Sequence, residues 1–175
     1  MTEYKLGKTI FTQEQIEARA AETGKQITAD YAGKEVFVVG ILTGCFMWTA
    51  EVMKSIGLSA SVDFMSVSSY GSATRSSGVV KIVKDLSMDI EGRHVIIFED
   101  IIDSGLTLEY LYGYLMGRGP ESLRICAMLD KPARRRVDIK ADYLGFTVPD
   151  MFLVGYGLDA CHKYRNLPYI AAIEE

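Results

Sequence analysis

Residues 95 to 108 read Val95-Ile96-Ile97-Phe98-Glu99-Asp100-Ile101-Ile102-Asp103-Ser104-Gly105-Leu106-Thr107-Leu108. The four apolar residues at the start of this stretch are typical of a strand buried on both faces of a parallel sheet. Two carboxylates, Glu99 and Asp100, follow at the carboxyl end of the strand, where open α/β sheets bind their ligands. The stretch therefore predicts an α/β fold with a ligand site at the end of a central strand.

A short turn from Asp103 to Thr107 comes next and leads into a helix expected from about Leu106 to Leu115. Such a turn offers free main-chain N–H groups, two hydroxyls and the positive end of a helix dipole, which together favour a phosphate. Carboxylates repel phosphates, so Glu99 and Asp100 are expected to face a sugar diol or a bound cation while the turn holds the phosphate. A ribose 5-phosphate has this arrangement of groups.

Strands and helices alternate along the rest of the chain. Thr12 and Gln15 form a capping-box pattern at the start of a helix predicted over residues 13–30, and Gly57 ends a second helix predicted over 46–56. Further strands are predicted over residues 36–42, 61–68, 79–83, 123–129 and 152–156, with 79–83 pairing with 61–68. This order predicts a parallel sheet with right-handed crossovers, flanked by helices.

Composition narrows the classes of function. The 175 residues suit one domain, and the net charge of −4 argues against nucleic acid as a partner. Three cysteines without metal-ligand spacing fit a reducing cytosol. Residues 1–10 contain no apolar signal core, and no apolar run approaches membrane-spanning length, so a cytoplasmic protein without a membrane partner is expected. The basic cluster Arg134-Arg135-Arg136 is interpreted as a solvated loop.

The stretch from residue 95 to 108 closely resembles the phosphoribosyl pyrophosphate signature of type I phosphoribosyltransferases. Other segments narrow the resemblance to the hypoxanthine-guanine phosphoribosyltransferases of bacterial purine salvage, over about residues 36–170. These segments are Val39-Gly40-Ile41-Leu42-Thr43-Gly44, Val62-Asp63-Phe64-Met65, Ser68-Ser69-Tyr70-Gly71, Leu129-Asp130-Lys131-Pro132, and the run from Pro149 to Asp159 followed by Arg165.

The resemblance implies the fold of this family: a twisted parallel sheet flanked by helices, in a single domain of residues 1–175. A small C-terminal hood is expected from about residues 131–175. The implied reaction moves the 5-phosphoribosyl group from phosphoribosyl pyrophosphate to hypoxanthine or guanine, with Mg²⁺ as cofactor, giving IMP or GMP and pyrophosphate. The family forms homodimers and homotetramers, and one of these is expected here.

The resemblance also assigns roles on the sugar side of the site. Asp103 would accept the purine N7 proton, although from the residues alone it also fits a helix N-cap. Glu99 and Asp100 would face the ribose hydroxyls and Mg²⁺, and Asp159 would be a further metal ligand. The 5-phosphate would be held by Ser104, Gly105, Leu106 and Thr107, with Leu106 standing where relatives often carry a polar residue.

On the purine side, the resemblance implies that Lys131 donates to O6, so that 6-oxopurines are the substrates. Phe152 would stack on the base, while Leu153 and Asp159 would line its edge. The pyrophosphate would meet Thr43, Gly44 and Arg165. Thr43 is the main departure from the residue pattern of the family, which usually has Lys or Arg at this position beside the pyrophosphate.

The Ser/Gly/Thr-rich segment from Ser69 to Gly78 matches the mobile loop of the family. Its composition and the position of Tyr70 predict a lid that closes over the reacting groups, with Ser69 and Tyr70 as its site residues.

Two alternative functions remain open at this point. One is a xanthine-preferring phosphoribosyltransferase, since Lys131 would serve any 6-oxopurine. The other is an RNA-binding regulator built on the same fold, which the acidic balance and Lys131 disfavour.

Overall fold

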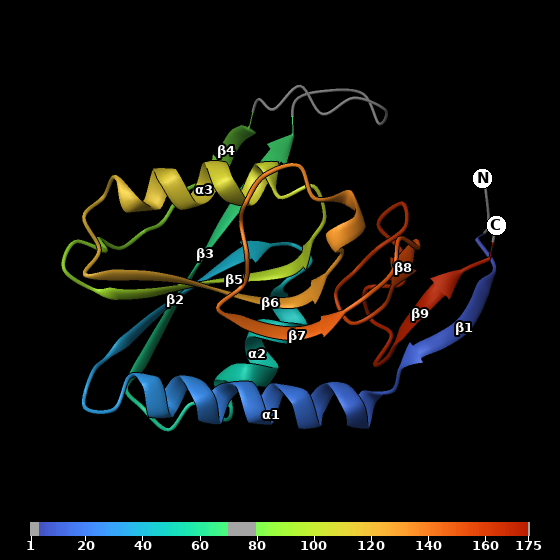
Figure 1. Ribbon diagram of the computed structural model, residues 1–175, viewed down its shortest axis with the longest axis horizontal. Helices are drawn as coiled ribbons and strands as arrows, with labels where there is room; N and C mark the ends of the chain where they lie inside the picture. The colour runs from blue at the N-terminus through green and yellow to red at the C-terminus, as the bar shows by residue number, and fades with distance from the viewer. Residues whose placement is uncertain (1–3, 70–79, 175) are drawn as a thin grey trace.

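The computed structural model describes residues 4–69 and 80–174, and a six-stranded sheet is its main feature (Figure 1). The strand order is β4-β3-β2-β5-β6-β7. Strand β4 is antiparallel to β3, and the other neighbouring pairs are parallel. The strands are β2 (Val36–Leu42), β3 (Ala60–Ser69), β4 (Val80–Lys84), β5 (His94–Ile102), β6 (Ser122–Asp130) and β7 (Tyr143–Thr147).

Helices cover both faces of this sheet. Helices α1 (Gln13–Asp30) and α2 (Phe46–Met53) lie on one face, and α3 (Leu106–Met116) lies on the other (Figure 1). Thr12 and Gln15 form the expected capping box at the start of α1. None of the helices in the described ranges combines the length and apolar composition that a membrane crossing requires.

The strand residues divide the core into two layers because side chains alternate between the faces of a strand. Val36, Val38, Ile96 and Phe98 pack with residues of α1 and α2, including the fully buried Trp48. Their strand neighbours pack on the opposite face with Leu108, Leu111 and Leu115 of α3; these neighbours are Phe37, Val39, Val95 and Ile97. Burial of both faces explains why the sequences of β2 and β5 are continuous apolar runs.

A second, three-stranded antiparallel sheet lies beyond the carboxyl ends of the parallel strands (Figure 1). Its order is β1-β9-β8, with β1 (Leu6–Phe11), β8 (Leu153–Val154) and β9 (Ile170–Ile173). The sequence predicted a hood from residues 131–175, and the small sheet also includes β1 from the amino-terminal part of the chain. The division into one domain with a C-terminal hood stays a prediction.

The α/β fold with a parallel sheet flanked by helices is confirmed, and several element bounds are corrected. Helix α2 ends at Met53 rather than at Ile56, and the strand predicted over 152–156 is reduced to Leu153–Val154. Strands β1, β7 and β9 were not predicted, because each is short and only part of it is buried. The predicted lid, including Tyr70, lies outside the described residues, as does the side chain of Ser69.

Candidate active site

The topology reverses between β2 and β5, and most of the predicted site residues gather there. The chain leaves β2 through α2 on one face of the sheet and leaves β5 through α3 on the other. Two loops that depart in opposite directions open a crevice at the carboxyl ends of these strands, which is the usual ligand position in open α/β sheets. Thr43 and Gly44 follow β2 directly, while Glu99 and Asp100 lie near the end of β5.

Gly44 is held between two other segments of the site. A Cβ added at Gly44 would lie 1.4 Å from Asp100 Oδ2, and one added at Gly157 would lie 2.0 Å from the Gly44 carbonyl oxygen. The Leu42–Thr43 peptide bond before it is cis, and the Thr43 side chain is exposed. The loop after β2, the end of β5 and the segment around Gly157 therefore meet without room for a side chain at Gly44.

Glu99 and Asp100 form a desolvated carboxylate pair. Both residues keep some exposed surface, but Glu99 Oε2 is buried and has no hydrogen-bond partner among the described residues. Burial and then the Asp100 charge raise the pKa of Glu99 well above its usual range. Burial also raises the pKa of Asp100 to about 6, against the opposing effects of the Ile101 N–H and the Arg165 charge. In the protein alone, the ionised form of this pair is disfavoured.

The turn after β5 has the geometry of an anion cradle. Gly105 is the N-cap of α3 and has a left-handed φ of 83°, which L side chains rarely adopt. Among the described residues, the main-chain N–H groups of Ser104 and Gly105 donate no hydrogen bond. Thr107 lies in the first helical turn, where N–H groups lack intrahelical acceptors. Leu106 donates its N–H to Ser104 Oγ at 3.4 Å.

Asp103 is not a helix cap, since α3 is capped at Gly105. Its side chain is 43% exposed and its Oδ1 lies 3.1 Å from Arg134 Nε, a charge contact without good hydrogen-bond alignment. Arg134 Nη1 also lies 3.7 Å from Asp150 Oδ1. Asp103 thus carries a partly exposed carboxylate whose buried Oδ1 faces Arg134 beside the turn, and the cap alternative considered for it is excluded.

Lys131 is an almost fully buried cation, 6% exposed, directly after β6. Its Nζ donates to the Met151 carbonyl at 2.9 Å and lies 3.8 Å from Asp150 Oδ1. Phe152, next to Met151 in sequence, is 52% exposed, and its ring lies 6.2 Å from that of Tyr4. Lys131 is therefore not an ordinary solvated lysine, and Phe152 is not part of the core.

Asp159 and Arg165 pair with each other on the other side of Gly44. Arg165 Nη2 lies 2.7 Å from Asp159 Oδ1, and its Nη1 donates to the Gly157 carbonyl at 2.6 Å. Asp159 Oδ2 accepts the His162 N–H at 2.7 Å. Burial is the main cause of the raised pKa of Asp100; the charge of Arg165 lowers this pKa and that of Asp159 raises it, so both charges act on the carboxylate pair.

One basic residue of the site was missed. Arg135 was interpreted as part of a solvated loop, but its side chain is only 16% exposed and contacts the turn after β5. The interpretation was wrong for Arg135 because a cluster of three arginines carries no sequence signal for which of them is buried. It holds for Arg136, which is exposed.

The carboxylates do not form a complete metal centre by themselves. Within the described ranges, no group of three or more His, Cys, Asp or Glu side chains is arranged to hold a metal ion. Glu99, Asp100 and Asp159 accordingly offer at most a partial ligand set. Mg²⁺ is usually bound in this way, through one or two carboxylates together with substrate phosphates and water.

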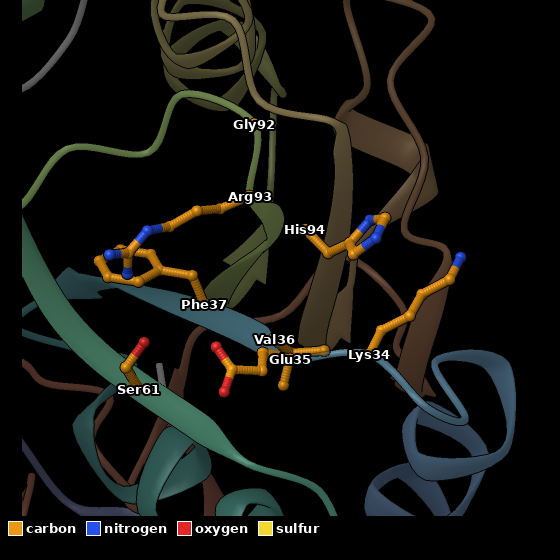
Figure 2. A pocket seen from close by; sticks show the side chains of 8 residues that line it. All are labelled: Lys34, Glu35, Val36, Phe37, Ser61, Gly92, Arg93 and His94. Carbon is orange, nitrogen blue, oxygen red and sulfur yellow. The ribbon is translucent and has the colours of Figure 1, made fainter.

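A different cavity lies at the opposite end of the sheet (Figure 2). Its volume is about 330 Å³, and it is lined by the amino ends of β2, β3 and β5. Arg93 stacks over the Phe37 ring at 5.1 Å there, and the lining includes no carboxylate pair and no helix N-terminus. The crevice at the carboxyl ends of the strands is therefore the better candidate for an active site.

Comparisons with known proteins identify the family of this chain. Residues 7–160 match the family model described as phosphoribosyl transferase domain. The chain is 46% identical over 174 residues to a hypoxanthine-guanine phosphoribosyltransferase of Bacillus subtilis, covering 99% of this chain and 97% of the relative. It is 49% identical over 175 residues to the enzyme of the same name from Streptococcus thermophilus, covering 100% and 97%. A crystal structure of such an enzyme from Bacillus anthracis superposes with a TM-score of 0.94 at 44% identity, covering 97% of this chain and 100% of that one.

We predict that Gly44→Ala destabilises the fold, because the added methyl group overlaps Asp100 Oδ2. Forced overpacking typically costs about 1–3 kcal/mol of unfolding free energy. Gly113→Ala is the matched control, since a Cβ there meets nothing within 4 Å and Ala stabilises a helix interior by about 0.5–1 kcal/mol. Urea unfolding of the three proteins measures both effects. Equal stability of Gly44→Ala and the unaltered protein would show that the loop has room to shift.

The raised pKa of Asp100 predicts a pH-dependent stability in Mg²⁺-free buffer. The folded protein binds this proton more tightly than the unfolded chain, whose Asp pKa is about 3.9, so the contribution of Asp100 is present at low pH. It is lost as pH rises through the folded pKa of about 6. The unfolding free energy of the unaltered protein should therefore fall relative to that of Asp100→Asn between those values. A difference between the two proteins that stays constant from pH 4 to pH 7 contradicts the assignment.

Proposed function

The chain belongs to the phosphoribosyl transferase domain family, and from this we infer that it is a hypoxanthine-guanine phosphoribosyltransferase of purine salvage. It transfers the 5-phosphoribosyl group of phosphoribosyl pyrophosphate to hypoxanthine or guanine and releases pyrophosphate. The carboxylate pair of Glu99 and Asp100, directly followed by the anion cradle at Ser104 and Gly105, is the observation that carries this assignment. A ribose 5-phosphate presents a diol and a phosphate that match these two parts.

Phosphoribosyl pyrophosphate is proposed to bind across the crevice between β2 and β5. The 5-phosphate would occupy the turn from Ser104 to Thr107, where free N–H groups and the dipole of α3 favour an anion. The ribose hydroxyls would face Glu99 and Asp100. The pyrophosphate would lie near Gly44 and Arg165, with Thr43 contributing no charge.

The carboxylates fit a magnesium ion. Glu99 Oε2 is buried and has no partner in the part of the chain that the structure describes. The pKa values of Glu99 and Asp100 are both raised by burial, so a cation beside them would stabilise their ionised forms. Glu99 and Asp100 are the proposed ligands, with Asp159 available once it separates from Arg165. Bound Mg²⁺ would neutralise charge on the pyrophosphate leaving group.

The remaining residues act on the sugar and the base. The transition state of such a transfer has oxocarbenium character at the anomeric carbon, and the carboxylates of Glu99 and Asp100 would stabilise that positive charge. Asp103, whose carboxylate is partly exposed beside the turn, would accept the N7 proton of the purine. Lys131 would donate to O6, with Phe152 stacking on the base and Leu153 at its edge.

A product assay with phosphoribosyl pyrophosphate, Mg²⁺ and hypoxanthine, guanine, xanthine or adenine tests the function directly. We expect IMP and GMP, with Mg²⁺ required. Turnover of adenine alone would overturn the assignment, and a clear preference for xanthine would select the narrower alternative. The comparisons do not favour an RNA-binding regulator. Assembly into a homodimer or homotetramer and a cytoplasmic location stay predictions.

Lys131→Ala is predicted to weaken purine binding selectively. The buried Nζ has carbonyl and carboxylate partners in the purine-free protein, and O6 would replace one of them. Removing the donor leaves O6 without a partner in a partly dry pocket, at about 1–3 kcal/mol. Initial rates at varied purine and varied phosphoribosyl pyrophosphate separate the two KM values. Equal increases in both would argue against a role in base selection.

Thr43→Lys is predicted to lower the KM for phosphoribosyl pyrophosphate. Thr43 is exposed beside Gly44, so a longer cationic side chain can be accommodated and would face a multiply charged ligand. The effect should be larger at low salt, since screening is weak when the Debye length is about 30 Å at 0.01 M. The purine KM should hardly change. An unchanged KM for phosphoribosyl pyrophosphate at low salt would mean that the loop binds through its main chain.

A further inference from the structure

The segment that follows β6 donates hydrogen bonds to the main-chain carbonyl groups of the turn after β5. Arg135 donates through Nε to the Asp103 carbonyl at 3.1 Å and through Nη2 to the Ile102 carbonyl at 3.3 Å. The main-chain N–H of Arg136 donates to the Ser104 carbonyl at 2.9 Å. Three successive carbonyls are thus fixed on one side of the turn, where the chain between β6 and β7 passes (Figure 1).

This arrangement determines where the N–H groups point. In a planar trans peptide, the N–H is directed opposite to the C=O. The Ile102 carbonyl also accepts the main-chain N–H of Lys131 at 3.0 Å. With these three carbonyls held by the segment after β6, the N–H groups of Asp103, Ser104 and Gly105 are directed to the other side of the turn. In the part of the chain that the structure describes, the last two of these donate no hydrogen bond. They are therefore free to bind an anion.

Arg135 is itself firmly anchored. Its Nη2 pairs with Asp130 Oδ1 and its Nη1 donates to the Ile139 carbonyl. Its Cδ would lie 3.0 Å from a Cβ at Gly105, so its aliphatic stem packs under the left-handed residue of the turn. The guanidinium thus joins the end of β6, the turn and residue Ile139 through one rigid planar group.

We propose that Arg135 is a positioning residue for the phosphate cradle: it touches no substrate, and it orients the turn so that the N–H groups face the 5-phosphate. The proposal rests on the proposed function of this site and assigns it a residue on the side away from the ligand. Lysine cannot replace arginine here, because the contacts need several donors in fixed planar directions.

The test compares Arg135→Ala with the unaltered protein in steady-state kinetics. Bonds from a charged donor typically contribute enough that their loss should raise the KM for phosphoribosyl pyrophosphate by about 10-fold to 100-fold. The KM for hypoxanthine should hardly change. Isothermal titration with ribose 5-phosphate, which carries the 5-phosphate and no pyrophosphate, should show a similar loss of affinity.

Two variants and a chemical rescue separate positioning from general damage to the fold. Lys140→Ala removes a cation from the same segment, and its exposed ammonium pairs with Asp138 instead, so both KM values should stay unchanged. Arg135→Lys keeps the charge and should still raise the KM for phosphoribosyl pyrophosphate. Added methylguanidinium should restore part of the lost affinity in Arg135→Ala and have no such effect on Lys140→Ala.

Failure of the inference is distinguishable from failure of the proposed function. If the unaltered protein turns over and Arg135→Ala and Arg135→Lys keep its KM for phosphoribosyl pyrophosphate, Arg135 does not position the cradle. Equal loss for both substrates, without methylguanidinium rescue, would overturn the inference as well. If the unaltered protein transfers no phosphoribosyl group, the proposed function fails, and the ribose 5-phosphate titration still decides whether Arg135 supports an anion site.

Discussion

Burial of two neighbouring carboxylates at the end of β5 is the constraint on which the rest of the site depends. Ionised groups in a dry environment are costly unless they are paired, and Glu99 has a buried oxygen that finds no partner in residues 4–69 and 80–174. The apolar run of β5 lies between two core layers and carries these carboxylates at its end, where each keeps only part of its surface exposed. A poorly satisfied polar group of this kind is typical of functional sites, and the proposed cation and diol would satisfy it.

The charges around this pair are organised in contacts that ligands can replace. Arg165 pairs with Asp159, Arg134 with Asp103, and Lys131 with a carbonyl. On binding, each proposed substrate group would therefore replace an existing partner of one of these side chains. Exchange of one partner for another costs less than creating a bare buried charge. This applies to Lys131 and to the pair of Arg165 and Asp159, which are already largely removed from solvent on folding.

The sequence predicted those parts of the fold and site that are determined by a local pattern of residues. The apolar run from Val95 to Phe98 predicted the central strand, and the turn from Asp103 to Thr107 predicted the start of α3 near Leu106. The small sheet was not predicted, because β1 and β9 pair across more than 150 residues and neither has a strong period. Arg135 was missed for a related reason: its partners at Ile102 and Asp103 are more than 30 residues away, and main-chain carbonyls have no sequence signature.

A single short segment after β6 links the two halves of the proposed site. Lys131, the proposed purine donor, contacts the Met151 carbonyl, Arg134 contacts the carboxylate of Asp103, and Arg135 holds the carbonyl of that same residue. Because Asp130 ends β6 and also anchors the Arg135 guanidinium, the position of the segment is set by a buried strand rather than by a loop. A displacement of β6 against β5 would therefore move Lys131, the carboxylate of Asp103 and the turn after β5 together. Because sites built on strands are held more precisely than sites on loops, strand pairing would fix the relative position of the proposed purine donor, proton acceptor and phosphate turn.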